Sequence, residues 1–191
     1  SRLDSTLSNP PKVHAFIIDT GVNPNHLEFR DCANCPSRLS LDFSSIQNEA
    51  DKADCNGHGT HVAATVGGRK YGVSSKVQLH SLRVLDCDGS GSTSGIMDAL
   101  DWLQSKFETE YKPNGERVVI NLSLGGSVDT VLDDKMNALV ALGITAAVAA
   151  GNEDQDACNS SPAAAKDVIT VGSTSKPTAQ TDARSDFSNW G

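Results

Sequence analysis

The chain has 191 residues, a net charge of −8 and a pI near 5.0, and 38% of its residues are hydrophobic. This composition is typical of a globular protein long enough for one domain with its own core. The acidic balance argues against nucleic acid as the main partner, because phosphate binding needs a basic face. No apolar run is long enough to cross a bilayer, so the sequence indicates no membrane partner.

The first expected strand ends in a carboxylate. Residues 1–12 are polar, contain Pro10-Pro11 and are expected to form an N-terminal arm, after which residues 13–18 form an apolar, β-branched run. Such a run predicts a buried parallel strand. Asp19 follows it directly, and the carboxyl end of a central strand is where α/β sheets place their active sites. An Asx-type turn is the alternative interpretation.

Residues 22–54 look irregular and polar, and a loop of this length is usually functional or held by a ligand. Asp51 and Asp54 in this loop are candidate calcium ligands, because calcium prefers oxygen donors. The alternative is that both carboxylates are simply solvated.

The next stretch places a histidine between two glycines. Gly57 and Gly59 let the backbone approach a substrate closely, and residues 60–66 predict a short buried helix that fixes His58 at its start. A histidine held rigidly beside open space suits a general base. The alternative is a core histidine in a tight turn.

The second half alternates strands and helices. Strands are expected at residues 77–85, 118–122, 144–150 and 168–171. One helix between them would bury Ile96, Leu100, Leu103 and Phe107, and another Val131, Leu132, Met136, Leu139 and Val140. This alternation predicts an α/β fold with a mostly parallel sheet.

Two rival sites fit the pattern less well. Gly89, Gly91 and Gly95 resemble a dinucleotide-binding loop, but the third glycine is one residue late and the loop follows the second strand rather than the first. His58 and His61 share a helix face, yet a catalytic zinc would need a third ligand and a general base, and no glutamate lies between them.

Acyl transfer accounts for more of the polar residues. Asp19 would orient the imidazole of His58, His58 would take the proton of a serine, and the Asn152 amide would donate to the oxyanion. Asn152 follows a glycine directly after an expected strand.

Five motifs in order carry a family resemblance: Ile18-Asp19-Thr20-Gly21, Asn56-Gly57-His58-Gly59-Thr60-His61-Val62-Ala63, Asn121-Leu122-Ser123-Leu124-Gly125-Gly126, Ala149-Ala150-Gly151-Asn152 and Phe187-Ser188-Asn189-Trp190-Gly191. From Val13 to Gly191 the chain resembles a subtilisin-family serine protease of the proteinase K-like branch.

The resemblance implies a fold and roles for these residues. The fold would be a mostly parallel twisted sheet with helices on both faces. Asp19, His58 and Asn152 would be the triad acid, the base and the oxyanion donor. Two extended segments would clamp a polypeptide substrate, namely Gly89-Ser90-Gly91 and Ser123-Leu124-Gly125. No cofactor would be needed for the chemistry, and calcium would serve only as a structural ion.

One element of the family pattern is absent from the sequence. The family's nucleophilic serine lies in a Gly-Thr-Ser-Met-Ala-type segment, and no serine among the 191 residues has that context. We therefore expect residues 13–191 to be the N-terminal portion of a peptidase domain truncated at its C-terminus, partnered by the missing C-terminal part and inactive alone. A non-catalytic peptide-binding half-protease is the alternative.

The cysteines favour an oxidising compartment. Five cysteines leave one without an internal partner, and no second close pair completes a zinc ribbon, so we expect disulfides in a secreted or vacuolar protein. Cys55 and Cys87 lie in loops that neighbouring parallel elements would bring together, and the resemblance supports the same pairing. Cys158 is expected to be free or bonded to a second chain, while Cys32 and Cys35 form a local loop or stay reduced.

Overall fold

The computed structural model describes residues 11–32, 34–46, 52–178 and 181–191, and it divides into two compact units, Ser1–Asn121 and Leu122–Gly191. The N-terminal arm expected at residues 1–12 therefore lies mostly outside the described residues. Within the part that is described, no helix is long and apolar enough to span a membrane.

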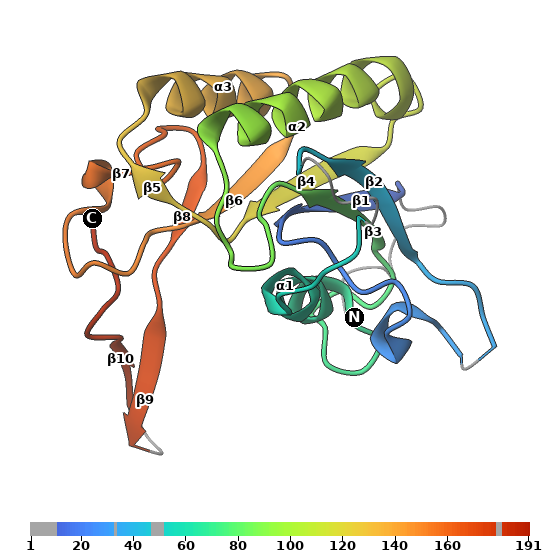
Figure 1. Ribbon diagram of the computed structural model, residues 1–191, viewed down its shortest axis with the longest axis horizontal. Helices are drawn as coiled ribbons and strands as arrows, with labels where there is room; N and C mark the ends of the chain where they lie inside the picture. Colours follow the sequence, from blue (N-terminus) through green and yellow to red (C-terminus); the bar gives the residue numbers. More distant parts are fainter. Residues whose placement is uncertain (1–10, 33, 47–51, 179–180) are drawn as a thin grey trace. The chain divides into compact units, whose positions relative to one another are not determined.

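The first unit is built on a parallel sheet with the strand order β2-β3-β1-β4. The strands are β1 (Val13–Asp19), β2 (Leu39–Ser44), β3 (Gln78–Arg83) and β4 (Arg117–Leu122). In this unit α1 (His58–Gly67) and α2 (Thr93–Lys106) lie on opposite sides of the sheet (Figure 1). Two shorter helical segments are η1 (Leu27–Phe29) and η2 (Phe107–Tyr111).

Strand β1 lies between β3 and β4 in the sheet, and both of its faces are covered. Ala15 and Ile17 belong to a buried cluster that includes Ala63 of α1. Phe16 faces the other way, where its ring stacks on His80 at 4.3 Å and meets Trp102 of α2 edge-on. Burial on both faces explains why this strand is continuously apolar in sequence, and it holds the carboxyl end of β1 rigidly.

The second unit contains the remaining strands and one long helix. These elements are β5 (Gly126–Ser127), α3 (Thr130–Ala141), β6 (Thr145–Ala149), η3 (Ala157–Asn159), β7 (Ser160–Ser161), β8 (Ile169–Val171), β9 (Thr174–Thr178) and β10 (Thr181–Arg184). Strands β6 and β8 pair in parallel, whereas β5 pairs with β7 and β9 with β10 in antiparallel fashion. The α/β class with a mostly parallel sheet is thus confirmed.

Several local expectations were wrong. Residues 22–54 are not irregular throughout, because β2 runs parallel to β3 inside this segment. Helix α1 begins at His58 rather than Thr60 and buries only one face, through Gly59, Ala63 and Gly67. In α3, Val131 is 64% exposed, because it lies in the first turn away from the face that buries Leu132. The hairpin β9–β10 was not anticipated.

Candidate active site

Asp19 and His58 meet at the end of β1. The Nδ1 of His58 lies 2.7 Å from Oδ1 of Asp19, and the same oxygen accepts a 2.7 Å hydrogen bond from the backbone N–H of Thr20. The Asp19 side chain is completely buried, while that of His58 is 48% exposed. A buried carboxylate thus holds one edge of an imidazole whose other edge is accessible, which is the arrangement that a general base needs.

A residue without a side chain is needed on either side of His58, for a different reason at each position. Gly57 has φ +104°, in the left-handed region where side chains are strained, and it allows the chain to turn into α1. A Cβ on Gly59 would collide with the carbonyl oxygen of Gly21 and touch Asp19. The absence of a side chain therefore lets the helix start pack directly against the end of β1.

The electrostatics of Asp19 reflect its burial. Desolvation raises the pKa of this carboxyl above its usual value, and the hydrogen bonds from His58 and Thr20 only partly oppose that shift. Within the described residues, Oδ2 of Asp19 is buried without a hydrogen-bond partner. The ionised form of this carboxylate therefore costs folding free energy. Such perturbed groups are common at functional sites.

The predicted oxyanion donor, Asn152, lies in the second unit and lines a cavity of about 360 Å³. Asn152 follows Gly151, which has φ +107°, and its own backbone N–H donates to Glu153. The cavity lining also includes Ser123, Leu124 and Gly125. The structure therefore places the second predicted substrate segment and Asn152 around one space.

The first predicted substrate segment forms an exposed turn in the first unit. The backbone N–H of Ser90 donates to the carboxylate of Asp86, and the carbonyl of Ser90 accepts from the N–H of Asp86. Gly89 adopts φ +80° in this turn, and Gly91 packs so closely on Val84 that a Cβ would collide with its carbonyl oxygen. Hydrogen bonds within the turn hold the conformation of this segment, and its residues stay exposed to solvent.

Of the two candidate calcium ligands, only Asp54 lies within the described residues. Asp51 lies outside the described residues, and the two oxygens of Asp54 accept hydrogen bonds from protein donors. Across the described ranges, no group of three or more His, Cys, Asp or Glu side chains is arranged to hold a metal ion. His58 and His61, which were considered above as zinc ligands, therefore belong to no such group within the described residues.

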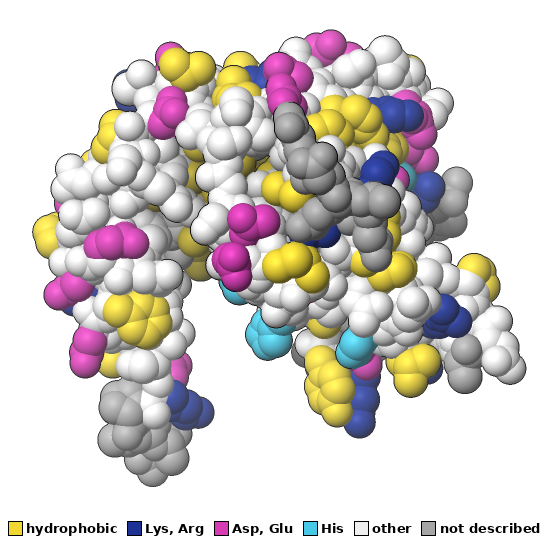
Figure 2. Space-filling view, viewed as in Figure 1, with side chains coloured by type: hydrophobic (Ala, Val, Ile, Leu, Met, Phe, Trp, Pro, Cys, Tyr) yellow, Lys and Arg dark blue, Asp and Glu magenta, His cyan; other side chains and the backbone are white. Residues whose placement is uncertain are grey.

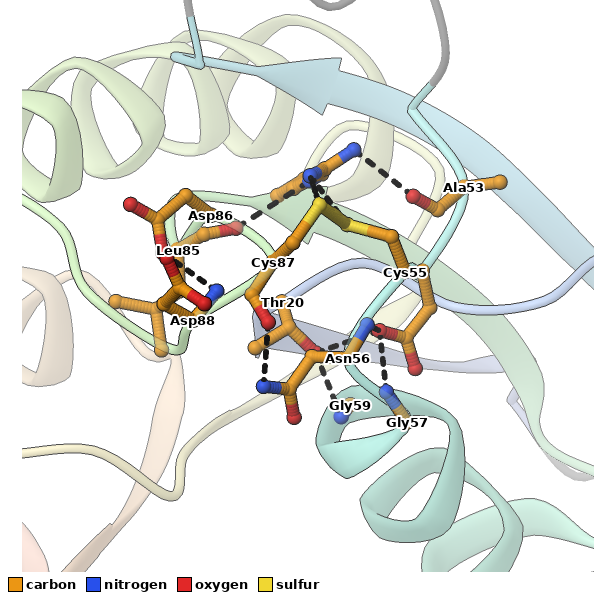
Figure 3. Close-up of a disulfide and its surroundings, with 12 residues drawn as sticks. Thr20, Ala53, Cys55, Asn56, Gly57, Gly59, Leu85, Asp86, Cys87 and Asp88 are labelled. Carbon is orange, nitrogen blue, oxygen red and sulfur yellow. Dashed lines mark hydrogen bonds between the residues drawn. A yellow bond between two sulfur atoms is a disulfide. The ribbon is translucent and has the colours of Figure 1, made fainter.

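A disulfide joins Cys55 to Cys87, with their Cα atoms 5.1 Å apart. Figure 3 shows it beside the start of α1, where the side-chain amide of Asn56 donates to the carbonyl oxygen of Cys87 at 2.9 Å. A second disulfide joins Cys32 to Cys35, and Cys158 is exposed and free. The first disulfide thus ties the exposed 86–90 turn to the helix that carries His58.

Sequence reasoning missed two residues next to this site. Thr20 was noted only as part of a motif, yet its hydroxyl accepts from the N–H of Gly59 at 2.9 Å. Arg83, only 2% exposed, donates to the carbonyl of Ala53 and contacts Sγ of Cys55 at 3.0 Å. An arginine inside the strand expected at residues 77–85 was the available signal, because a charge that becomes buried needs partners.

Comparison with known proteins settles the family. The Subtilase family model matches residues 13–191. The chain belongs to the subtilase family. It is 46% identical over 179 residues to the alkaline serine exoprotease A of Vibrio alginolyticus and 45% identical over 179 residues to the extracellular serine proteinase of a Thermus species. A crystal structure of a cold-adapted subtilisin-like serine proteinase is 44% identical, with a TM-score of 0.78.

This subtilase chain corresponds to only part of those relatives. Each match covers 94% of the chain, but 30% of the Vibrio protein, 40% of the Thermus protein and 59% of the chain in the crystal structure.

Figure 2 shows acidic side chains scattered over the visible face, with lysines and arginines singly or in small groups. Among the described residues on that face, the lysines and arginines form no continuous basic patch.

Proposed function

We propose that the protein containing this subtilase chain is a secreted serine endopeptidase in which Asp19 and His58 are the acid and base of the catalytic triad. The observation that carries the proposal is the 2.7 Å contact between the fully buried Asp19 and the half-exposed His58. Family membership supports the same assignment, because the relatives are serine proteases.

The proposed chemistry follows from the tautomer that this contact selects. With Nδ1–H of His58 donating to Asp19, Nε2 carries the lone pair and takes the proton of the attacking serine hydroxyl. The serine oxygen bonds to the substrate carbonyl carbon, and the imidazolium returns its proton to the leaving amine as the C–N bond breaks. The serine itself would come from a C-terminal part of the peptidase domain that this sequence does not contain.

Asn152 is the proposed oxyanion donor. Within the described residues its side-chain amide has no protein hydrogen-bond partner, and it lines the 360 Å³ cavity. An amide N–H that lines a cavity can donate to the negative charge that develops on a substrate carbonyl oxygen bound there. Ser123, Leu124 and Gly125 line the same cavity and would present backbone groups to a polypeptide there.

An exported enzyme fits the cysteine chemistry. Two disulfides in one chain are typical of oxidising compartments. One relative is described as an extracellular serine proteinase. The proposed substrates are polypeptides outside the cytoplasm, bound mainly through their main chain.

Fluorophosphonate labelling of the full-length protein tests the proposal. We expect labelling of wild-type protein and hydrolysis of an unstructured protein such as casein, both lost in His58→Ala and strongly reduced in Asp19→Asn. His26→Gln, an exposed histidine substitution outside the proposed triad, serves as the control. No labelling of correctly folded wild type would support the non-catalytic peptide-binding alternative instead.

A second arm concerns the 191-residue chain alone. It should neither label nor cleave, because the base has no nucleophile to activate. Activity should appear when a C-terminal segment carrying the family's serine is added under oxidising conditions. Inhibitor-sensitive cleavage by the pure chain alone would contradict this part of the proposal.

A further inference from the structure

Asp54 is the most heavily bonded carboxylate around the start of α1. Its Oδ1 accepts from the backbone N–H groups of Asn56 and Gly57, each at 2.9 Å. Its Oδ2 accepts from the backbone N–H of Thr60 at 3.0 Å and from the Thr60 hydroxyl at 2.6 Å. The carboxylate therefore binds donors on both sides of His58 in sequence and closes the first turn of the helix.

A fifth hydrogen bond connects Asp54 to the end of β1. The hydroxyl of Thr20 donates to Oδ1 of Asp54 at 2.9 Å and accepts from the N–H of Gly59 at 2.9 Å. The backbone N–H of Thr20 in turn donates to Asp19. Figure 3 shows Thr20, Gly57 and Gly59 converging at the helix start. The Asp54 carboxylate thus links the end of the strand that carries Asp19 to the helix that carries His58.

We propose that Asp54 is a positioning residue that fixes the Asp19–His58 pair in its catalytic geometry. The inference rests on the proposed peptidase function. Neither Asp54 nor Thr20 touches the accessible edge of His58 in these contacts; both act on the backbone that determines where the imidazole lies. Misplacing a catalytic group by about 1 Å lowers turnover by about 10²-fold, so a defect here should appear in kcat.

The bonding pattern favours positioning over the calcium-ligand alternative. A carboxylate offers about four lone-pair sites, and five donors already occupy those of Asp54. Burial alone would raise the pKa of Asp54, but the hydrogen bonds from Gly57 and Thr60 outweigh burial and hold that pKa below its usual value. The group stays ionised at the positive end of α1, where an anion is stabilised.

The test compares Asp54→Asn, Thr20→Val and the double variant in the full-length enzyme. We expect Asp54→Asn to lower kcat by about 10- to 100-fold with KM changed less than about threefold. The two substitutions should be non-additive, because both break the same connection. Asp98→Asn, which removes an exposed carboxylate from α2, is the charge-matched control and should leave kcat unchanged.

Two further measurements do not depend on turnover alone. The downfield NMR resonance of the His58 Nδ1 proton should be present in wild type and in Asp98→Asn, and broadened or lost in Asp54→Asn. Chelation by EDTA should leave the kcat ratio of wild type to Asp54→Asn unchanged. If EDTA lowered the wild-type kcat to the Asp54→Asn level with no further effect on the variant, Asp54 would be a calcium ligand.

The outcomes separate this proposal from the proposed function. An inactive, unlabelled but folded wild type would refute the peptidase assignment. An active wild type whose kcat and His58 resonance are unchanged by Asp54→Asn would overturn the positioning role alone. A variant with a lower melting temperature but wild-type kcat where it is folded would also overturn it, because that is the signature of a merely structural cap.

Discussion

His14 and His80 share a buried hydrogen bond of 2.8 Å between Nδ1 of the first and Nε2 of the second. Each ring has a carboxylate at its other end, with Glu116 3.0 Å from His14 and Asp42 2.5 Å from His80. The four groups form a line on the sheet face opposite α1, covered by the rings of Phe16 and Tyr111.

Proton counting shows that these contacts cannot all be hydrogen bonds while both imidazoles are neutral and both carboxylates are ionised. Three contacts need three hydrogens, but two ionised carboxylates and two neutral imidazoles supply only two. Burial lowers the pKa of His14, His80 and Lys12 add to that effect, and Glu116 opposes it. Burial of His14 therefore opposes uptake of a third hydrogen at that ring.

The first prediction is a loss of stability on mild acidification. Because the pKa of His14 is below 6.5 in the folded state, the unfolded state binds more protons in the window just below that value. The free energy of unfolding should therefore fall as pH is lowered from about 7 to about 5, above the range where most carboxylates titrate. Urea unfolding across that window measures the slope.

His14→Phe supplies the comparison. It removes the titrating ring while retaining an aromatic group beside Tyr111, so its slope should be smaller than that of wild type even if its absolute stability is lower. His26→Gln, at an exposed histidine, should retain the wild-type slope. Equal slopes for wild type and His14→Phe would contradict this assignment.

The second prediction concerns Asp19 and separates stability from activity. Because burial raises the pKa of Asp19, its ionised form costs folding free energy, and its stabilising contribution is present below the unfolded-state pKa and lost as pH rises through the folded-state value. Asp19→Asn should therefore raise the melting temperature at neutral pH. In the full-length enzyme it should lower kcat by about 10⁴-fold, because the imidazole loses its oriented tautomer.

Differential scanning calorimetry and initial rates measured on the same preparations check this trade-off. Asp182→Asn, an exposed residue of β10, is the control that should change neither quantity. An Asp19→Asn variant less stable than wild type at neutral pH would show that the carboxylate is a net stabilising group.

The third prediction compares the two disulfides. Cys55 and Cys87 are 32 residues apart, so replacing both by alanine should lower the free energy of unfolding by about 3 to 4 kcal/mol through the larger entropy of the unfolded chain. Cys32 and Cys35 are three residues apart, and their double replacement should cost about 2 kcal/mol or less. Chemical unfolding of both double variants measures the difference, and equal losses would show that loop length does not determine the effect.

Sequence reasoning worked where a signal is local. The apolar run ending at Asp19 and the glycines around His58 are consecutive in the chain, and they correctly predicted β1 and the start of a helix near His58. The same holds for β3, β4 and β6, whose bounds differ from expectation by one or two residues.

It failed where a residue's role depends on distant partners. β2 was missed for a different reason, because Leu39, Leu41 and Phe43 alternate with polar residues in the period-2 pattern of a half-buried strand, and this local signal was overlooked. Asp54 was expected to bind calcium or to be solvated, and its connection to the end of β1 depends on Thr20, which is 34 residues away. The buried line from Asp42 to Glu116 joins three strands and the turn before β4, so no local pattern revealed it.

The last prediction tests Asn152 in the full-length enzyme. Asn152→Ala should lower kcat by about 10²- to 10³-fold with little change in KM, because the lost hydrogen bond forms only as negative charge develops in the transition state. Its side chain is exposed and has no protein partner within the described residues, so the melting temperature should stay within about 1 °C of wild type. Asn114→Ala, in the exposed turn after η2, is the matched control. A raised KM at unchanged kcat would assign Asn152 to ground-state substrate binding, and a lowered melting temperature at unchanged kcat would make it a structural cap.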